Sequence, residues 1–149
     1  MHKALKKFDY RMFERAKSVA QESDFKGTNM GCVITYKGHV ISQAANTKKT
    51  SPIQKHYNKY RHFRNNGGKV VHSLHCETRA LSLIPYTVAQ KIDWSRVNVY
   101  IFRIAPGLPL GHGNARPCEG CMQALRDKGI QNVYYSTNDG FAYERILSR

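Results

Sequence analysis

The chain has 149 residues, enough for one domain with a substantial core and too few for two ordinary domains. Its 24 Lys and Arg residues against 10 Asp and Glu residues give a formal net charge of +14, which attracts phosphate-bearing molecules over a long range unless it serves solubility alone. No apolar run approaches the roughly 20 residues of a membrane-spanning helix and no signal-peptide pattern opens the chain, so we expect a soluble, cytoplasmic protein.

A helix and a β-hairpin are predicted at the start of the chain. Apolar residues recur at helical spacing through residues 9–23, and Asp9 is available as a cap. Two β-branched runs, 30–36 and 39–46, come next, and the turn residues Lys37-Gly38 join them. This pattern is typical of two antiparallel strands.

A basic segment, residues 46–69, follows the hairpin and contains no acidic residue. We expect a loop and then a short helix there, in which Tyr57, Tyr60 and Phe63 recur at every third position. Two interpretations stay open: the rings and cations form a stacking and phosphate surface for single-stranded nucleic acid, or the rings face the core and the cations are solvated. The candidate phosphate or nucleic-acid contacts are Lys48, Lys49, Lys55, Lys59, Arg61 and Arg64.

Helices and strands alternate through the rest of the chain. The predicted order is a helix over 73–84, a short helix over 87–94, a strand buried on both faces over 97–104, a loop over 105–116, a helix over 117–129 and a strand over 132–136. The residues Asn138-Asp139-Gly140 then predict a hairpin, so the last strand should be antiparallel to the one before it. We therefore expect a three-layer α/β/α sandwich over residues 1–149, with a five-stranded mixed sheet.

The stretch "PCEGC" contains two cysteines that could be two of the ligands of a metal site. Pro117 suits the first position of a helix, and Cys118 and Cys121 then lie three residues apart on one face of its N-terminus, where the helix dipole favours thiolates. A thioredoxin-like redox pair has the same spacing, but here the pair follows a late strand, and the chain has no thioredoxin-like beginning. Two such thiolates are suitable ligands for zinc.

The stretch "SLHCETRALSLI" supplies a third ligand and an acid–base group. His75 is the candidate zinc ligand, and a catalytic zinc keeps a fourth position for water. Glu77, in the first helical turn, is placed to move the protons of that water, because a cap residue and its successor can face one pocket. The alternative is a structural zinc site with Glu77 as the fourth ligand, although such closed sites are usually richer in Cys.

The combination of His-x-Glu with Pro-Cys-x-x-Cys resembles the cytidine and deoxycytidylate deaminase superfamily of zinc enzymes. The resemblance runs from the first hairpin through "HCETRAL" and "ARPCEGCMQAL" to "GIQNVYYS". It implies the cytidine deaminase fold, one zinc ion per chain, and hydrolytic deamination at C4 of cytosine or C6 of adenine with Glu77 as the proton carrier. Relatives often assemble into dimers or tetramers, so a homo-oligomer is an expected partner state.

Further site residues follow from the family pattern and from the neighbourhood of the motifs. Asn46 matches the family's asparagine that touches the sugar or base, although a turn residue would look the same. Cys76 stands where relatives often have Ala, and it is a candidate substrate contact, although Cys32 and Cys76 are also typical small core residues. The residues His72, His112 and Arg116 flank the two motif loops and are candidates to line the substrate mouth.

The substrate expected from these observations is a cytosine base in a phosphate-bearing molecule, either a nucleotide or single-stranded nucleic acid. An antiparallel last strand resembles the cytidine deaminase branch of the superfamily. The tRNA adenosine and deoxycytidylate deaminase branches instead resemble a fold with a parallel last strand, which the chain reaches through a further helix. Too few residues follow "YYST" for a helix and a strand. The high positive charge favours a phosphate. The alternatives are adenosine deamination in tRNA or another nucleic acid, and a non-catalytic nucleic-acid-binding protein that retains zinc.

Overall fold

The apolar run "VNVYIFRI" forms β3 (Val97–Ile104), the middle strand of the sheet in the computed structural model, which describes residues 4–25, 27–61 and 73–147. Successive side chains of a strand point to opposite faces of the sheet. Val99 and Ile101 accordingly belong to one hydrophobic core, and Tyr100 and Phe102 belong to the other. The prediction of a strand buried on both faces is confirmed.

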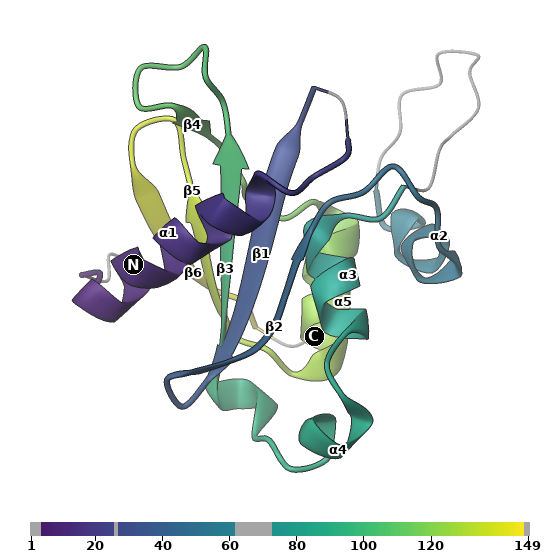
Figure 1. The fold of residues 1–149 in the computed structure, drawn as a ribbon. Coiled ribbons are helices and arrows are strands. Elements are labelled where there is room, and N and C mark those ends of the chain that lie inside the picture. Colours follow the sequence, from purple (N-terminus) through teal and green to yellow (C-terminus); the bar gives the residue numbers. More distant parts are fainter. Residues whose placement is uncertain (1–3, 26, 62–72, 148–149) are drawn as a thin grey trace.

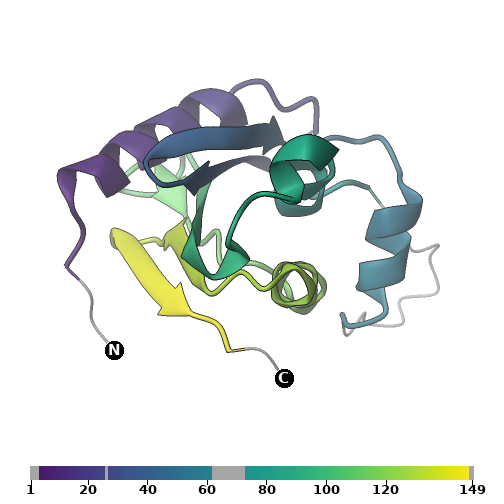
Figure 2. The same cartoon turned by 90° about the horizontal axis from the view of Figure 1, so that it is seen from below.

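Helices cover both faces of the sheet, which confirms the α/β/α sandwich. The helix α1 (Lys7–Ala20) lies across one face, and α3 (Cys76–Ser82) and α5 (Glu119–Lys128) lie side by side on the other (Figures 1 and 2). The two cores follow this division, since Phe13 and Ala16 of α1 fill one of them, and residues of α3 and α5 fill the other.

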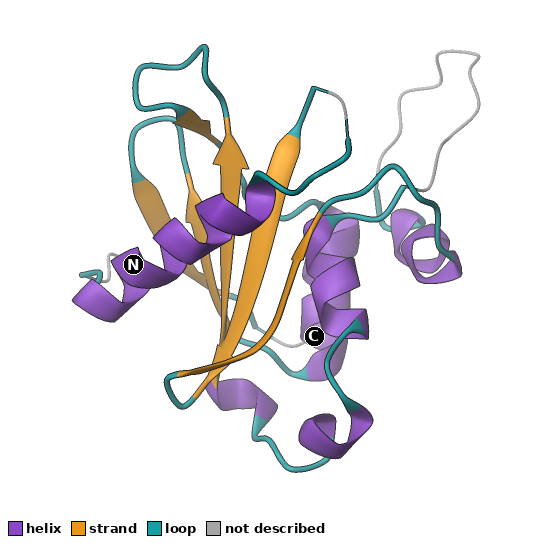
Figure 3. Cartoon of the chain, in the orientation of Figure 1, coloured by secondary structure: helices purple, strands orange, loops and turns teal. Residues whose placement is uncertain are grey.

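The sheet is mixed, as predicted (Figure 3). Its remaining long strands are β1 (Asn29–Tyr36), β2 (His39–Ala45), β5 (Asn132–Ser136) and β6 (Phe141–Arg145), and the order across the sheet is β2-β1-β3-β5-β6. Strands β3 and β5 pair in parallel, while β1 with β2, β1 with β3, and β5 with β6 are antiparallel. The antiparallel hairpin predicted at Asn138-Asp139-Gly140 is therefore present.

The described residues form six strands, one more than predicted. A sixth, β4 (His112–Gly113), lies in the segment predicted as a loop and pairs with the end of β3. The Ala105 N–H group donates to the Gly111 carbonyl over 2.9 Å, which closes a turn and returns the chain beside β3. A two-residue strand of this kind depends on the turn and has no apolar pattern of its own.

Two helix starts also differ from the prediction. Helix α1 begins at Lys7, so Asp9 lies inside its first turn, where its carboxylate accepts the Lys6 N–H group over 2.9 Å. Pro117 lies outside α5, because Cys118 is the cap residue and accepts the N–H group of Cys121 with its side chain. A cysteine that caps a helix keeps an extended backbone, which leaves the preceding proline in the loop.

The remaining helices are short. Helix α2 (Pro52–Asn58) corresponds to the helix predicted in the basic segment but ends before Tyr60, and α3 is shorter than the predicted span of 73–84. The predicted helix over 87–94 is one turn, α4 (Tyr86–Ala89), followed by a 3-10 turn at Trp94–Arg96. In the described part of the chain, no helix combines the length and the apolar character needed to cross a membrane.

Candidate active site

The predicted metal ligands come together where α3 and α5 begin. His75 is the cap residue of α3, Cys118 is the cap residue of α5, and Cys121 lies in the first turn of α5. The Nδ1 atom of His75 lies 3.3 Å from Sγ of Cys121 and 3.5 Å from Sγ of Cys118. All three ligand atoms lie within 4.8 Å of one another.

This geometry fits a zinc ion. Bonds of about 2.3 Å to sulfur and about 2.0–2.1 Å to nitrogen, at tetrahedral angles, place neighbouring ligand atoms about 3.5–3.8 Å apart. The two nitrogen–sulfur distances are close to that spacing. One imidazole and two thiols are also a donor set that zinc prefers, and three protein ligands leave one tetrahedral position for water.

The pKa values of the three candidate ligands are shifted to different extents and in different directions. A hydrogen bond from Cys121, supported by one from His75, lowers the pKa of the Cys118 thiol to about 4. The same hydrogen bond, together with burial, raises the pKa of Cys121 well above its ordinary value. Burial disfavours a charged His75, but the hydrogen bond with Cys118 and the charge of Glu77 outweigh it, so the pKa of His75 is raised. Zinc would displace the thiol and imidazole protons, because only the deprotonated forms bind metal.

Glu77 lies beside this group and is almost completely buried, with 3% of its surface exposed. His75 has extended backbone angles as the cap of α3, so the helical rotation of side chains begins only after it. His75 and Glu77 can therefore line the same cavity although they are two positions apart. The thiol of Cys76 donates to Oε1 of Glu77 over 2.9 Å, and burial raises the pKa of the Glu77 carboxyl group.

The cavity in front of these residues has a volume of about 330 Å³. Three arginines from three different parts of the chain line it: Arg61, Arg103 and Arg116. Phe25 and Met30 contribute apolar surface. The arrangement can hold a planar, partly apolar ligand that carries negative charge, because guanidinium groups recognise phosphate and carboxylate.

A comparison with protein families gives one match over most of the chain. Residues 6–137 match the family described as the cytidine and deoxycytidylate deaminase zinc-binding region. The chain belongs to this family. Membership indicates a hydrolytic deaminase that acts on a cytosine-type base, and the His-Cys-Cys group lies within the matched residues.

Solved structures show the same fold. The dCMP deaminase of the cyanophage S-TIM5, in complex with dCMP and dUMP, aligns with a TM-score of 0.53 at 17% identity, over 91% of this chain and 85% of that one. The cytidine deaminase of Burkholderia pseudomallei aligns with a TM-score of 0.56 at 13% identity, over 91% of both chains. At these identities the likeness concerns the fold alone. A search of curated proteins finds no match.

Asn46 lines the cavity of this deaminase from the end of β2. Its Oδ1 atom accepts hydrogen bonds from the Met30 N–H group over 3.0 Å and from the Ser23 hydroxyl over 2.6 Å. Its Nδ2 atom donates to the Thr28 carbonyl over 2.8 Å. The side chain therefore holds the segment before β1 in place, and its contact with a substrate stays a prediction.

Helix α2 supports the deaminase site from outside. Gln54 is fully buried, and its Oε1 atom accepts the N–H group of His75 over 3.0 Å and the hydroxyl of Thr78 over 2.6 Å. Its Nε2 atom donates to Asn58, which in turn accepts from Arg61. The inner face of α2 is thus connected by hydrogen bonds to the first metal ligand.

The close approach of α2 and α5 depends on Gly120. A Cβ atom at this position would lie 2.6 Å from the carbonyl oxygen of Tyr57. Tyr57 also donates from its hydroxyl to Asp127 of α5 over 2.8 Å and packs against the core. The packing interpretation of this ring is confirmed, whereas Tyr60 is 39% exposed.

The other predicted contacts fall into three groups. Arg61 lines the cavity, and its Nη1 atom lies 3.4 Å from Nε2 of His75. Four lysines are exposed on the surface: Lys48, Lys49, Lys55 and Lys59. Three residues lie outside the described part of the chain: Phe63, Arg64 and His72.

His112 is not among the residues that line the cavity, whereas Arg116 is one of them. His112 is 7% exposed, its Nδ1 atom contacts the Thr137 carbonyl at 2.7 Å, and its ring stacks on Phe141. Because β4 pairs with β3, His112 is part of the sheet, where its side chain packs between neighbouring strands.

The sequence analysis missed Arg103 and Gln54. Arg103 stands near the end of a predicted strand, where polar residues often reach a site, and this position was an available signal. Gln54 offered no signal, since a glutamine next to Lys55 in a basic segment has the pattern of a solvent-exposed residue.

Proposed function

We propose that this protein deaminates the cytosine base of a phosphate-bearing nucleotide and holds one zinc ion per chain. The observation that carries the proposal is the position of the His75, Cys118 and Cys121 group beside the buried Glu77, at a cavity lined by three arginines. Four free cysteines suit the reducing cytoplasm, where we place the protein.

His75, Cys118 and Cys121 are the proposed zinc ligands, and Glu77 is the proposed proton carrier. Zinc held there supplies a Lewis acid that activates water for attack on the amidine carbon of a base. Glu77 accepts a proton from the attacking water and delivers it to the ring nitrogen, and it then passes the second proton to the departing amino group. The C4–N bond of cytosine breaks, a C4–O bond forms, and ammonia leaves.

The arginines support a substrate with a phosphate. Arg61, Arg103 and Arg116 reach the cavity from the end of α2, from β3 and from the loop before α5. A cavity of about 330 Å³ is at the lower end of the size range of ligand pockets, which suits one nucleotide better than several. The similar cyanophage dCMP deaminase, which holds dCMP and dUMP, supports a nucleoside monophosphate as the substrate class.

Mass spectrometry of the reaction products tests this proposal. The zinc-loaded protein is incubated with cytidine, deoxycytidine, their monophosphates, single-stranded DNA, single-stranded RNA and a transfer RNA. We expect a gain of one mass unit on the monophosphates. Glu77→Gln, which keeps the shape of the side chain but cannot carry the proton, should lower the rate by about 10²–10⁴ while its zinc content stays unchanged.

The alternative functions are outcomes of the same assay. Conversion in the polynucleotides alone would assign the exposed lysines to strand binding and would refute a nucleotide substrate. Conversion only of adenosine in a transfer RNA would refute the cytosine base. If Glu77→Gln and wild type are both inactive on all of these, the protein is a zinc-retaining binding protein.

A further inference from the structure

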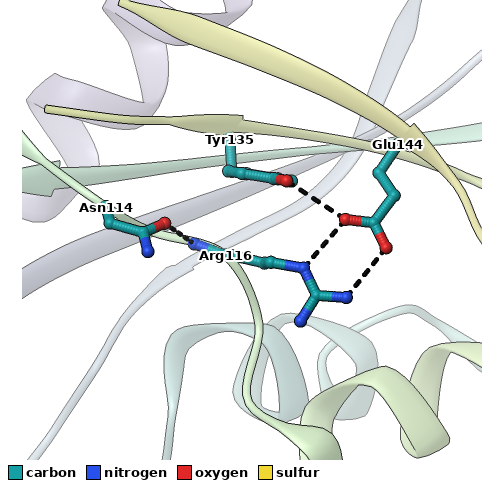
Figure 4. A network of polar contacts seen from close by, with 4 residues as sticks. All are labelled: Asn114, Arg116, Tyr135 and Glu144. Carbon is teal, nitrogen blue, oxygen red and sulfur yellow. Dashed lines mark hydrogen bonds and ion pairs between the residues drawn. The ribbon is translucent and has the colours of Figure 1, made fainter. Parts of the chain in front are cut away.

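A carboxylate of the last strand holds one of the cavity arginines. Glu144 of β6 accepts two hydrogen bonds from Arg116, one from Nε and one from Nη2, each over 2.9 Å (Figure 4). Parallel bonds of this kind fix the plane of a guanidinium group as well as its position. Tyr135 of β5 donates to the same carboxylate over 3.1 Å, which ties Glu144 to the neighbouring strand.

The backbone that carries Arg116 is held by the same hairpin. The Ala115 N–H group donates to the Ser136 carbonyl over 2.9 Å, and the Asn114 N–H group donates to Asn138 over 3.1 Å. Asn114 in turn accepts the Arg116 N–H group over 2.9 Å (Figure 4). Arg116 is thus anchored at its backbone and at the end of its side chain by strands β5 and β6.

Arg116 nevertheless lines the cavity together with Arg61 and Arg103. Its ion pair uses Nε and Nη2, so the third guanidinium nitrogen, Nη1, takes no part in it. A long side chain that is already immobilised loses less conformational entropy when it binds a ligand than a freely rotating one. A held guanidinium group at this cavity is therefore prepared to bind an anionic oxygen.

We infer that Glu144 is a positioning residue that sets the preference of the site for phosphate-bearing over phosphate-free ligands, by holding Arg116 against the phosphate. The inference rests on the proposed function for the identity of the ligand. It opposes a simpler expectation, in which the negative charge of Glu144 merely weakens the attraction of the site for phosphate. The two accounts predict changes of opposite sign when the charge is removed.

The test measures the dissociation constants of dUMP and deoxyuridine by calorimetry, and of the ribose pair UMP and uridine, on the zinc-loaded protein. These compounds are uracil products, so no turnover disturbs the measurement. We expect Glu144→Gln to reduce the preference for the monophosphate by about three- to tenfold, with the affinity for the nucleoside unchanged. Tyr135→Phe, which keeps the ion pair but removes one of its supports, should reduce the preference by a smaller factor.

Glu119→Gln is the matched control. Glu119 is exposed, and its charge also raises the pKa of Arg116, so this variant makes the same chemical change near the same guanidinium group. The control should leave the preference unchanged or increase it. Zinc content and melting temperature are recorded for each variant, and Tyr135→Phe carries the test if Glu144→Gln does not fold.

An unchanged or increased preference in Glu144→Gln and in Tyr135→Phe would overturn the inference. Equal losses of monophosphate and nucleoside binding would overturn it too, because they would indicate a general structural role. A wild-type protein that prefers dUMP but deaminates no cytosine substrate would refute the proposed function and leave this inference standing. A wild-type protein without any preference would refute the inference whatever its activity.

Discussion

Replacing Gln54 with leucine should separate α2 from the metal site. Gln54 is fully buried and makes three hydrogen bonds, to His75, Thr78 and Asn58. Leucine has a similar volume and cannot make any of them. The variant therefore tests whether this amide, which does not line the cavity, holds the first zinc ligand in place.

The expected loss of stability follows from the partners that remain. Each lost bond contributes about 0.5–1.5 kcal/mol, and a part-buried donor left without an acceptor costs about 1–3 kcal/mol. The Thr78 hydroxyl can still donate to the His75 carbonyl over 3.2 Å, and Asn58 still accepts from Arg61 over 3.3 Å, whereas the His75 N–H group loses its acceptor. After an offset for the better burial of leucine, we expect a loss of about 2–4 kcal/mol.

Thermal unfolding with a chelator present measures this loss without the contribution of zinc binding. For a chain of this length the melting temperature should fall by on the order of 10 °C. Competition with a chromogenic chelator should then show zinc affinity weakened by about tenfold or more, as for other residues that orient a metal ligand.

Gln43→Leu is the control for these measurements. Gln43 lies on an exposed part of β2 and accepts one hydrogen bond from Arg15 over 2.7 Å. The same substitution there should change the stability by no more than about 0.5 kcal/mol, as surface substitutions usually do. If Gln54→Leu has the same melting temperature as this control and the same zinc affinity as wild type, α2 does not support the zinc ligand as we propose.

Three further predictions concern the metal, the pH dependence and the packing of α1. Cys118→Ser should bind less than one zinc per chain by elemental analysis, with unfolding at a lower temperature than zinc-loaded wild type. Burial and the hydrogen bond to Asp127 raise the pKa of Tyr57 to about 12. The folded state therefore binds the hydroxyl proton of Tyr57 more tightly than the unfolded state does. The contribution of this proton to stability is complete below pH 10 and is lost as the pH rises toward 12. Tyr57→Phe should remove that loss in urea unfolding at several pH values, and an unchanged pH profile would contradict the assignment. A Cβ atom on Gly31 would lie 2.6 Å from a backbone nitrogen of α1, so Gly31→Ala should destabilise by about 1–3 kcal/mol in denaturant melts, while Gly107→Ala, with open space around it, should not.

Much of the fold follows from patterns within short stretches. The run "VNVYIFRI" predicts a doubly buried strand because every residue type in it suits a pleated apolar surface. Asn138-Asp139-Gly140 predicts the last hairpin because these residue types are typical of short turns between strands. Helix starts were predicted less well, because a cap such as Cys118 depends on which backbone N–H group its side chain meets.

The sequence by itself identified the metal ligands and Glu77 as candidates, because these residue types occur at short, characteristic spacings near the starts of two predicted helices. Only the tertiary structure decided that Gln54 supports His75, that Glu144 holds Arg116, that Arg103 reaches the cavity and that His112 does not. The two supporting pairs are 21 and 28 residues apart in the chain. A periodic pattern shows which face of one element is buried, but the residue that it meets there depends on how the helices pack against the sheet.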